Sequence, residues 1–413
     1  MPECNPMSDA MSRRTFLQGS AATAIAHAIP ASANQTASSL SRRKLFAYLG
    51  TYTSAVDGGG NGKGIYLFEA DPSTGALKQI KLAASTPNPS SLAASPSGEY
   101  LYAVNEIATY QGHTGSVSAF AVNRETGDLT PLNTLSSEGS LPAHLSLDAT
   151  GKYLFAANYG GGSIAVLPIQ KDGSLGAATD VHADTGNVGP TTATNAPPGS
   201  FAFSGHDAPH AHNIIIDTNN KFVLQTDLGQ DRIYVYSFDA ASGKLTPAAT
   251  PYVSLPPGDG PRHLAFHPNG RWLYSIQEES STLAFFSYDG STGALASQQT
   301  ISALPPGFTG TSFASEVQVS ADGKFVYAAN RLHDSITVFK VGLKGELTYA
   351  GEAATRGDYP RQFTTDPTGK SLYVCNQRSD NLTSFRIDRE SGLLKFTGQY
   401  VPVGSPSCLI FLP

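Results

Sequence analysis

The sequence predicts an all-β protein folded as a seven-bladed β-propeller, and three observations support this prediction. The first is composition: 41 Gly and 27 Pro make up 68 of the 413 residues, and only 15% of the residues are charged. Gly and Pro are the poorest helix formers, so this composition favours short strands joined by turns. The second is a repeated pair of strands, and the third is a pattern shared between the two ends of the chain.

A strand–turn–strand unit occurs six times along the chain. A second motif occurs seven times and consists of a strand, a turn and a short apolar segment that follows the turn. Asn tolerates the left-handed turn conformation better than other residues with a side chain, so it is an acceptable replacement for Gly at the turn. The turn residues of the six units are Gly98, Gly151, Asn220, Gly270, Gly323 and Gly369.

The missing seventh unit is divided between the chain ends. Residues 406–411 match its first strand, and residues 44–50 match its second strand. Four strands per unit of roughly 50 residues, repeated seven times, describe a propeller whose ring is closed by strands from both ends. We therefore assign residues 44–413 to one propeller. An insertion at about residues 180–209 lengthens one interval, and loops of this length are usually functional or disordered.

The first 33 residues are interpreted as an export signal. Arg13 and Arg14 precede a weakly apolar run over residues 19–29, and small residues follow at 31–33. This order is typical of a signal peptide, and the paired arginines followed by Phe16 and Leu17 resemble the twin-arginine export motif. We expect an exported protein, periplasmic or secreted, with a linker at residues 34–43 and no membrane span after signal removal.

Charge and cysteine content narrow the choice of partners. A net charge of −6 predicts no binding to nucleic acid or to an anionic membrane surface. Cys375 and Cys408 form neither a disulfide framework nor a metal-binding pattern. His210 and His212 could face one metal from an extended segment, but no second cluster completes such a site. We therefore expect no metal and no other cofactor, and the phosphate-binding and dinucleotide fingerprints are missing.

The repeat also predicts the position of a functional site. The open ends of the hairpins should meet at one face of the ring, where residues about eight positions from each turn should gather. These positions are polar or charged while the strand interiors are apolar, which is typical of a concave binding site, although polar strand ends also face water for purely structural reasons. The residues at these positions that we single out are His263, Arg262, Glu278, Glu316, Asn330, Arg331 and Arg361.

These residue types favour attack on an ester-like carbonyl by water. Arg262 and Arg331 can bind a carboxylate or phosphate, or stabilise a developing oxyanion. His210, His212 or Glu278 can accept a proton from water. The sequence contains no Gly-x-Ser-x-Gly elbow that would present a serine nucleophile.

Several segments resemble the seven-bladed lactonase family, which includes propeller-type 6-phosphogluconolactonases and fungal-type carboxymuconate lactonizing enzymes. The resemblance covers about residues 44–413, and the most specific segment is Gly-Pro-Arg-His at 260–263 followed by Phe-His-Pro at 266–268. It implies a 6-phosphogluconolactonase-like lactone hydrolase acting on a small lactone or sugar acid in carbohydrate metabolism. The catalytic residues implied are His210 or His212, Arg262, Glu278 and Arg331; the substrate-binding residues that we add from the ring are His263, Glu316, Asn330 and Arg361.

Two other functions remain open at this point. One is a non-catalytic exported propeller that binds a ligand or a protein, since propellers serve many functions. The other is a lactonizing cycloisomerase of the muconate type. The sequence leaves open which lactone is used, whether it is phosphorylated, which of His210 and His212 faces the channel, and the oligomeric state.

Overall fold

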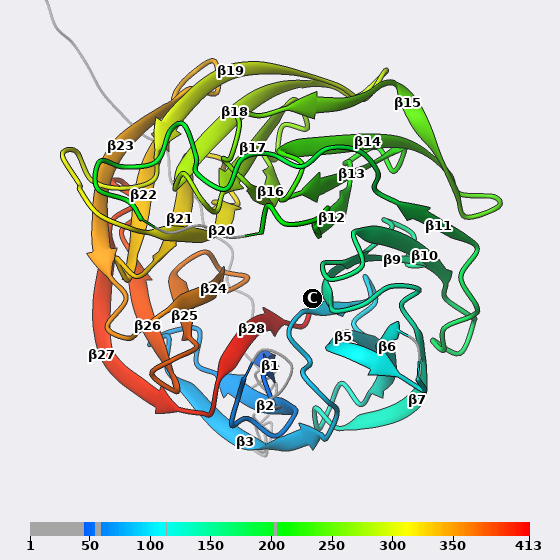
Figure 1. Cartoon of the computed structure of the whole chain (residues 1–413). Coiled ribbons are helices and arrows are strands. Elements are labelled where there is room, and N and C mark those ends of the chain that lie inside the picture. The colour runs from blue at the N-terminus through cyan, green and yellow to red at the C-terminus, as the bar shows by residue number, and fades with distance from the viewer. Residues whose placement is uncertain (1–44, 54–58, 113, 202–204) are drawn as a thin grey trace, which may run out of the picture. The chain divides into compact units, whose positions relative to one another are not determined.

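A computed structural model describes residues 45–53, 59–112, 114–201 and 205–413. The predicted signal at 1–33 and linker at 34–43 lie outside the described residues. Within those ranges the chain forms seven four-stranded antiparallel sheets and no helix, and hence no helix long and apolar enough to cross a membrane. Figure 1 shows the sheets arranged as seven blades around a common centre, as predicted.

Six blades are built from consecutive strands, and their first strands contact one another around the centre. The blades are β4 (Leu92–Ala94), β5 (Tyr100–Tyr110), β6 (Thr114–Val122), β7 (Leu129–Ser136); β8 (Pro142–Leu147), β9 (Tyr153–Asn158), β10 (Ser163–Pro168), β11 (Asp180–Ala183); β12 (Ala211–Ile216), β13 (Phe222–Asp227), β14 (Arg232–Asp239), β15 (Lys244–Ser254); β16 (Pro261–Phe266), β17 (Trp272–Gln277), β18 (Thr282–Asp289), β19 (Ala294–Ser302); β20 (Phe313–Val319), β21 (Phe325–Arg331), β22 (Ser335–Val341), β23 (Leu347–Ala354); and β24 (Pro360–Thr365), β25 (Ser371–Asn376), β26 (Asn381–Ile387), β27 (Leu394–Pro402).

The seventh blade joins the two ends of the chain. Its inner strand is β28 (Pro406–Phe411), which pairs with β1 (Leu45–Thr51), followed by β2 (Ile65–Ala70) and β3 (Leu77–Ala84). The register runs from Ala47 opposite Phe411 to Gly50 opposite Cys408. The predicted ring closure is thus confirmed.

The turns of the hairpins adopt the predicted conformation. Asn220 has φ of 58°, and the five glycines at the equivalent positions have φ between 64° and 73°. A backbone position with φ in this region strongly favours Gly or Asn, which explains the residue types seen at the turns of the repeat.

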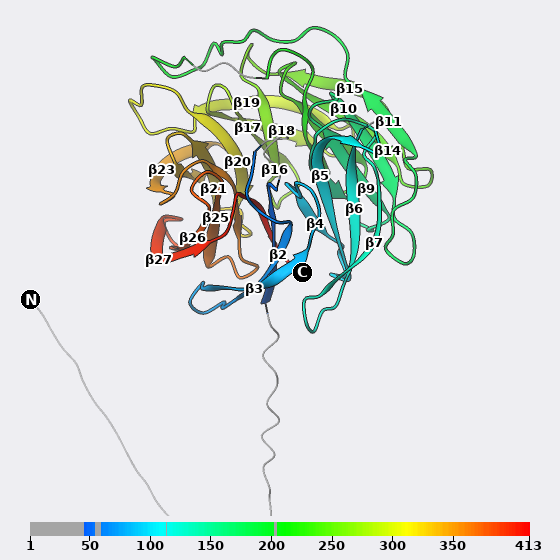
Figure 2. The ribbon, with the colours of Figure 1, turned by 60° about the horizontal axis from the view of Figure 1, so that its bottom comes forward.

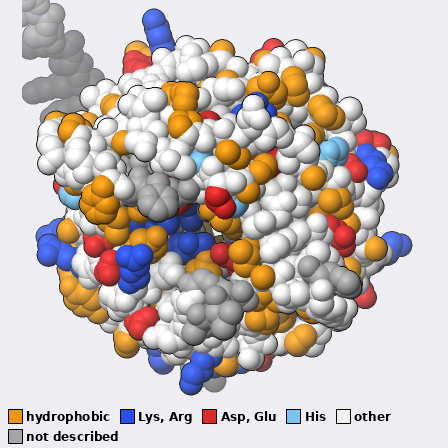
Figure 3. All heavy atoms as spheres, viewed as in Figure 1, with side chains coloured by type: hydrophobic (Ala, Val, Ile, Leu, Met, Phe, Trp, Pro, Cys, Tyr) orange, Lys and Arg blue, Asp and Glu red, His pale blue; other side chains and the backbone are white. Residues whose placement is uncertain are grey.

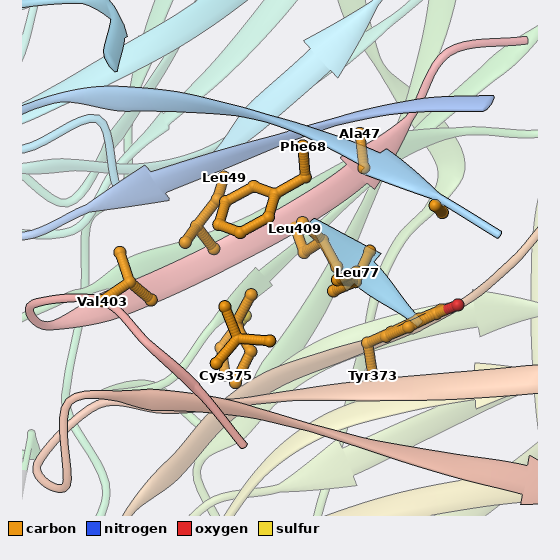
Figure 4. Close-up of a cluster of buried hydrophobic side chains, with 11 residues drawn as sticks. Ala47, Leu49, Phe68, Leu77, Tyr373, Cys375, Val403 and Leu409 are labelled. Carbon is orange, nitrogen blue, oxygen red and sulfur yellow. The ribbon is translucent and has the colours of Figure 1, made fainter. Parts of the chain in front are cut away.

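Apolar side chains between neighbouring blades form the core. Figure 4 shows one such layer, in which Leu49, Phe68 and Leu409 of the closing blade face Tyr373 and Cys375 of the next blade. All five are fully buried. Each buried Leu or Phe contributes about 1.5 to 3 kcal/mol of hydrophobic stabilisation, so the blades are held together chiefly by these layers.

The insertion begins later than predicted. Residues 180–183 form β11, the outer strand of the β8–β11 blade, because they pair with β10 and complete its fourth position. The segment that follows crosses the open-end face of the ring before it enters β12 (Figures 1 and 2). Backbone bonds from Gly189 to Gly229 (2.8 Å) and from Gly310 to Pro198 (2.8 Å) hold it against two different blades.

Candidate active site

A β-bulge at the open end of most hairpins sets which side chains reach the centre of the ring. In β16–β17, Pro261 pairs with Gln277 and His263 pairs with Ile276, so Arg262 is an extra residue without a partner. One extra residue breaks the strict alternation of a strand, so two successive side chains turn to the same side. The extra residues in four other blades are Ala143, His212, Arg361 and Ser407.

These doubled positions line a cavity of about 330 Å³ in the centre of the ring. Its wall comes from the first strands of all seven blades, and both members of each bulge pair belong to it, as Arg262 and His263 illustrate. A regular hairpin without the bulge would have turned one member of each pair away from the cavity. Figure 3 shows basic side chains in a hollow near the middle of this face, with acidic side chains beside them.

Arg262, Glu278 and Arg331 form a buried ionic cluster at the open end of the ring. Oε2 of Glu278 lies 2.8 Å from Nε of Arg262 and 2.7 Å from Nη2 of Arg331. Arg262 also donates from Nη1 to the carbonyl of Ser315. Arg331 donates from Nε and Nη2 to the carbonyls of Phe313 and Ala314. The carboxylate that follows β17 and three carbonyls of β20 therefore fix both guanidinium groups in place.

Each charged group in this cluster stabilises the ionised form of its partners. Burial by itself would raise the pKa of Glu278, but Arg331 and Arg262 outweigh it and lower the pKa below its ordinary value. Burial, with a further contribution from Arg331, lowers the pKa of Arg262 to about 10, so its guanidinium stays charged at neutral pH. The cluster thus presents two cations and one carboxylate.

Three histidines and Glu316 line the cavity beside Arg262. His263 is at 5.4 Å from His144 and 5.2 Å from His212 between ring centroids, and its Nδ1 lies 3.1 Å from Oε1 of Glu316. Burial is the main cause that lowers the pKa of His144, to about 3, and the neighbouring His263 is the second cause. Burial and then Arg262 lower the pKa values of His212 and His263 well below the usual value. All three imidazoles are therefore neutral at physiological pH.

Of the two histidines that the sequence analysis left open, His212 lines the cavity. Its Nδ1 is buried and has no hydrogen-bond partner among the described residues. His210 instead stacks on Tyr159 with 4.2 Å between the ring centroids, donates from Nε2 to Oδ1 of Asp207 (3.0 Å), and does not line the cavity.

Asn330, which the sequence analysis placed with the substrate-binding residues, is not among the side chains that line the cavity, and the same is true of Glu278 and Arg331. Its amide donates to the carbonyl of Ala303 (2.9 Å) and to the hydroxyls of Ser335 and Thr337. Asn158 makes equivalent bonds to Ser137 and Ser163 in another blade. The repeated asparagine therefore holds a blade to its connecting loop.

Arg361 lines the cavity from β24, and its partner is a residue that the sequence analysis did not select. Nη2 of Arg361 lies 3.4 Å from Oε2 of Glu106, and the same carboxylate oxygen accepts from the Tyr52 hydroxyl at 2.7 Å. Glu106 occupies the position in its hairpin that Glu278 occupies in another, so the repeat carried the signal. Tyr52 lies outside the repeated hairpins and had no such signal.

Metal-binding geometry is not present in the described ranges, where no three His, Cys, Asp or Glu side chains are grouped closely enough to hold an ion. The polar side chains of the cavity carry guanidinium, imidazole, carboxyl, amide and hydroxyl groups. This set can bind an anion, hydrogen-bond a carbonyl or hydroxyl, and accept a proton from water.

Comparison with known proteins gives consistent results over nearly the whole chain. Residues 46–411 match the family described as "Lactonase, 7-bladed beta-propeller". A 6-phosphogluconolactonase from Bacillus subtilis is 36% identical over 89% of this chain and 99% of its own length. A 6-phosphogluconolactonase from Formosa agariphila is 30% identical over 88% of this chain and 98% of its own. The structure of a periplasmic gluconolactonase from Pseudomonas aeruginosa superposes with a TM-score of 0.79 at 32% identity, covering 90% and 99% of the two chains.

Proposed function

We propose that the chain, which belongs to the seven-bladed β-propeller lactonase family and is a lactone hydrolase, opens a sugar lactone in its central cavity. Water attacks the lactone carbonyl directly, and no covalent intermediate with the protein is formed. The observation that carries this proposal is the shared carboxylate of Glu278, which holds Arg331 beside the cavity-lining Arg262.

Arg262 and Arg331 have the role of stabilising the oxyanion. When water adds to the lactone carbonyl, negative charge develops on the carbonyl oxygen, and fixed cationic donors lower the energy of that state without reorganising. Glu278 keeps the two cations together in the free enzyme. Breakage of the bond to the ring oxygen then returns the carbonyl, the leaving oxygen takes up the proton that the attacking water gave to the base, and the open-chain acid is released.

His212 is the stronger candidate for the group that accepts the proton of the attacking water. It is neutral, its Nδ1 has no hydrogen-bond partner in the described part of the chain, and the side chain lines the cavity. The acceptor oxygen Oε2 of Glu278 is occupied by two guanidinium groups, which makes this carboxylate a weaker base. His210, stacked on Tyr159 and bonded to Asp207, has a positioning role beside it.

Lactone hydrolysis, followed as acid release, tests this proposal. We expect metal-independent hydrolysis of gluconolactone or 6-phosphogluconolactone above the spontaneous rate, and their ratio reports whether a phosphate is recognised. Arg262→Ala should lower kcat about 100-fold or more, as the loss of an oxyanion donor does in other hydrolases. Arg271→Ala, an exposed arginine at the far end of the same hairpin, is the matched control.

His212→Gln and Glu278→Gln separate the two candidate bases. If His212 is the base, His212→Gln removes turnover while lactone affinity stays near that of the unchanged protein, and Glu278→Gln weakens both. No hydrolysis of either lactone, with cyclisation of a muconate instead, would support the lactonizing alternative. Binding of lactone without any turnover would support the non-catalytic one.

We also propose that the protein acts outside the cytoplasm. The support is the twin-arginine-like pattern at Arg13 and Arg14, together with the similarity to a relative described as periplasmic. Cell fractionation tests this: an Arg13→Lys, Arg14→Lys double variant should stay in the cytoplasm. Equal export of both forms would contradict the proposal.

A further inference from the structure

The side chains in and beside the central cavity carry more positive than negative charge. Arg262 and Arg361 both line it, and Arg331 joins Arg262 through their common partner. Only two carboxylates pair with these three guanidinium groups among the described residues, namely those of Glu278 and Glu106. One positive charge is therefore left over, and the neutral histidines add none.

The remaining carboxyl group in the cavity, Glu316, is poorly suited to balance that charge. It is 7% exposed and accepts hydrogen bonds from the neutral His263 ring and from the backbone of Val317 (3.0 Å). Burial raises the pKa of Glu316 to about 7, although Arg262 and His144 act in the opposite direction. Its charged and titratable neighbours, from each strand packed around it, are His144, Arg262, His263, Arg361, Cys375 and Cys408.

The arginines retain donors for a ligand. Arg361 uses Nη2 for Glu106 and lies with its guanidinium 4.9 Å from the centre of the Tyr52 ring. Among the described residues, Nε and Nη1 of Arg361 and Nη2 of Arg262 bond to no protein acceptor. A planar carboxylate matches the paired N–H groups of a guanidinium.

We propose that the cavity binds the carboxylate of a hydroxy acid between Arg262 and Arg361, and that each bound carboxylate is accompanied by one proton held on Glu316. The choice of a sugar acid as the ligand rests on the proposed function, because that acid is the product of lactone opening. Hydroxyl groups of the acid would meet the side chains of Ser90 and Asn213, which line the same cavity. The Oγ of Ser90 and the Oδ1 of Asn213 are buried and have no partner within the residues that the structure describes. Bound product thus competes with lactone more strongly at lower pH.

Calorimetric titration of the full chain with sodium gluconate tests this inference without any need for turnover. A carboxylate of this kind stays ionised between pH 6 and pH 8, so a pH effect reports on the protein. We expect Kd to rise about tenfold from pH 6 to pH 8, as one linked proton with a pKa near 7 requires. The binding heats in two buffers of different ionisation enthalpy should show uptake of about one proton per gluconate at pH 8.

Glu316→Gln should bind gluconate with the low-pH affinity throughout this range and without proton uptake. Glu125→Gln, an exposed carboxyl on another blade, is the control and should behave as the unchanged protein. Arg361→Ala should weaken gluconate binding at least tenfold. Glucitol, which has the hydroxyls but no charge, should bind weakly and independently of pH, and 6-phosphogluconate reports whether a phosphate replaces the carboxylate.

Three results would overturn the inference. They are no gluconate binding at millimolar concentration, binding without proton uptake in the unchanged protein, and equal binding by Arg361→Ala. Because the proton count comes from the unchanged protein, the test stands even if Glu316→Gln does not fold. Hydrolysis of lactone without gluconate binding would contradict this inference and leave the proposed function intact, whereas gluconate binding with proton uptake but no hydrolysis would do the reverse.

Discussion

The two halves of the ring around the cavity share one backbone geometry and differ in their side chains. At the open ends of β12, β16, β20 and β24 the wall carries His212, Arg262, Glu316 and Arg361. We call these four residues the charged arc, after the two guanidinium groups among them. At the ends of β28, β4 and β8 the wall carries the small arc, which we define as Ser407, Ser90, Ser91 and Ala143.

The comparison separates what the repeat supplies from what each copy supplies. The bulge occurs in both halves, with Arg262 as the extra residue in one and Ser407 in the other. The backbone therefore decides that two side chains per blade reach the centre. The residue types then decide that one half supplies charge while the other leaves space for a ligand.

The largest expected effect comes from breaking the ionic cluster beside the charged arc. Glu278→Ala leaves Arg262 and Arg331 buried without their common carboxylate, and loss of one partner of a buried pair costs about 3 to 5 kcal/mol. Urea unfolding measures this loss. A change below 1 kcal/mol, comparable to that of an exposed carboxyl variant such as Glu125→Gln, would show that the cluster is solvated and that the two arcs differ less than the structure indicates.

The second prediction concerns the pH dependence of stability in the charged arc. Because the folded pKa of Glu316 is raised, to about 7, the folded state holds this proton more tightly than the unfolded state. The resulting stabilisation is complete below the unfolded pKa and is lost as pH rises through about 7. The free energy of unfolding of Glu316→Gln, relative to the unchanged protein, should therefore rise by up to about 3 kcal/mol between pH 4 and pH 8. Parallel pH profiles of the two proteins would contradict this.

The third prediction fills the small arc. Ala143→Leu places three further carbons in the cavity wall, so KM for lactone should rise about tenfold, with an overpacking cost of about 1 to 3 kcal/mol. Ala149→Leu, at an exposed turn position of the same blade, is the control. Unchanged kinetics in Ala143→Leu would mean that the ligand does not enter the space that the small arc leaves.

The smallest effect is expected outside both arcs. Asp207 is 81% exposed and pairs with His210, and ion pairs of this kind contribute about 0 to 1 kcal/mol. Asp207→Ala should therefore keep kcat within about twofold of the unchanged protein. A loss of 100-fold in the lactone assay would instead move His210 into the chemistry and extend the charged arc toward it.

Most of the fold could be predicted because each hairpin repeats the same strand pattern and the same type of turn residue. The turn glycines, Asn220 at the equivalent position and the divided seventh unit required only the strand period and the preference for positive φ. Arg262, Glu278 and Arg331 could be grouped for the same reason, since equivalent positions meet at one end of the ring.

The remaining details depended on tertiary contacts that a repeat does not encode. The bulges place Arg262 and His263 on the same side, which a two-residue period contradicts. The role of Asn330 follows from a carbonyl in a neighbouring loop, and Tyr52 approaches Glu106 from outside the repeat. Such residues are found only when the contacts between blades are known.

The pairing of β28 with β1 also means that one blade can be completed only late in the synthesis of the chain. During synthesis β1 emerges first, and its inner edge stays unpaired until nearly the whole chain has left the ribosome. Until then that edge has free backbone donors and acceptors, which can pair with another chain. Ser407 and Cys408, supplied by β28, complete the cavity wall at the same moment. A nascent or truncated chain that lacks β28 therefore lacks this part of the cavity wall.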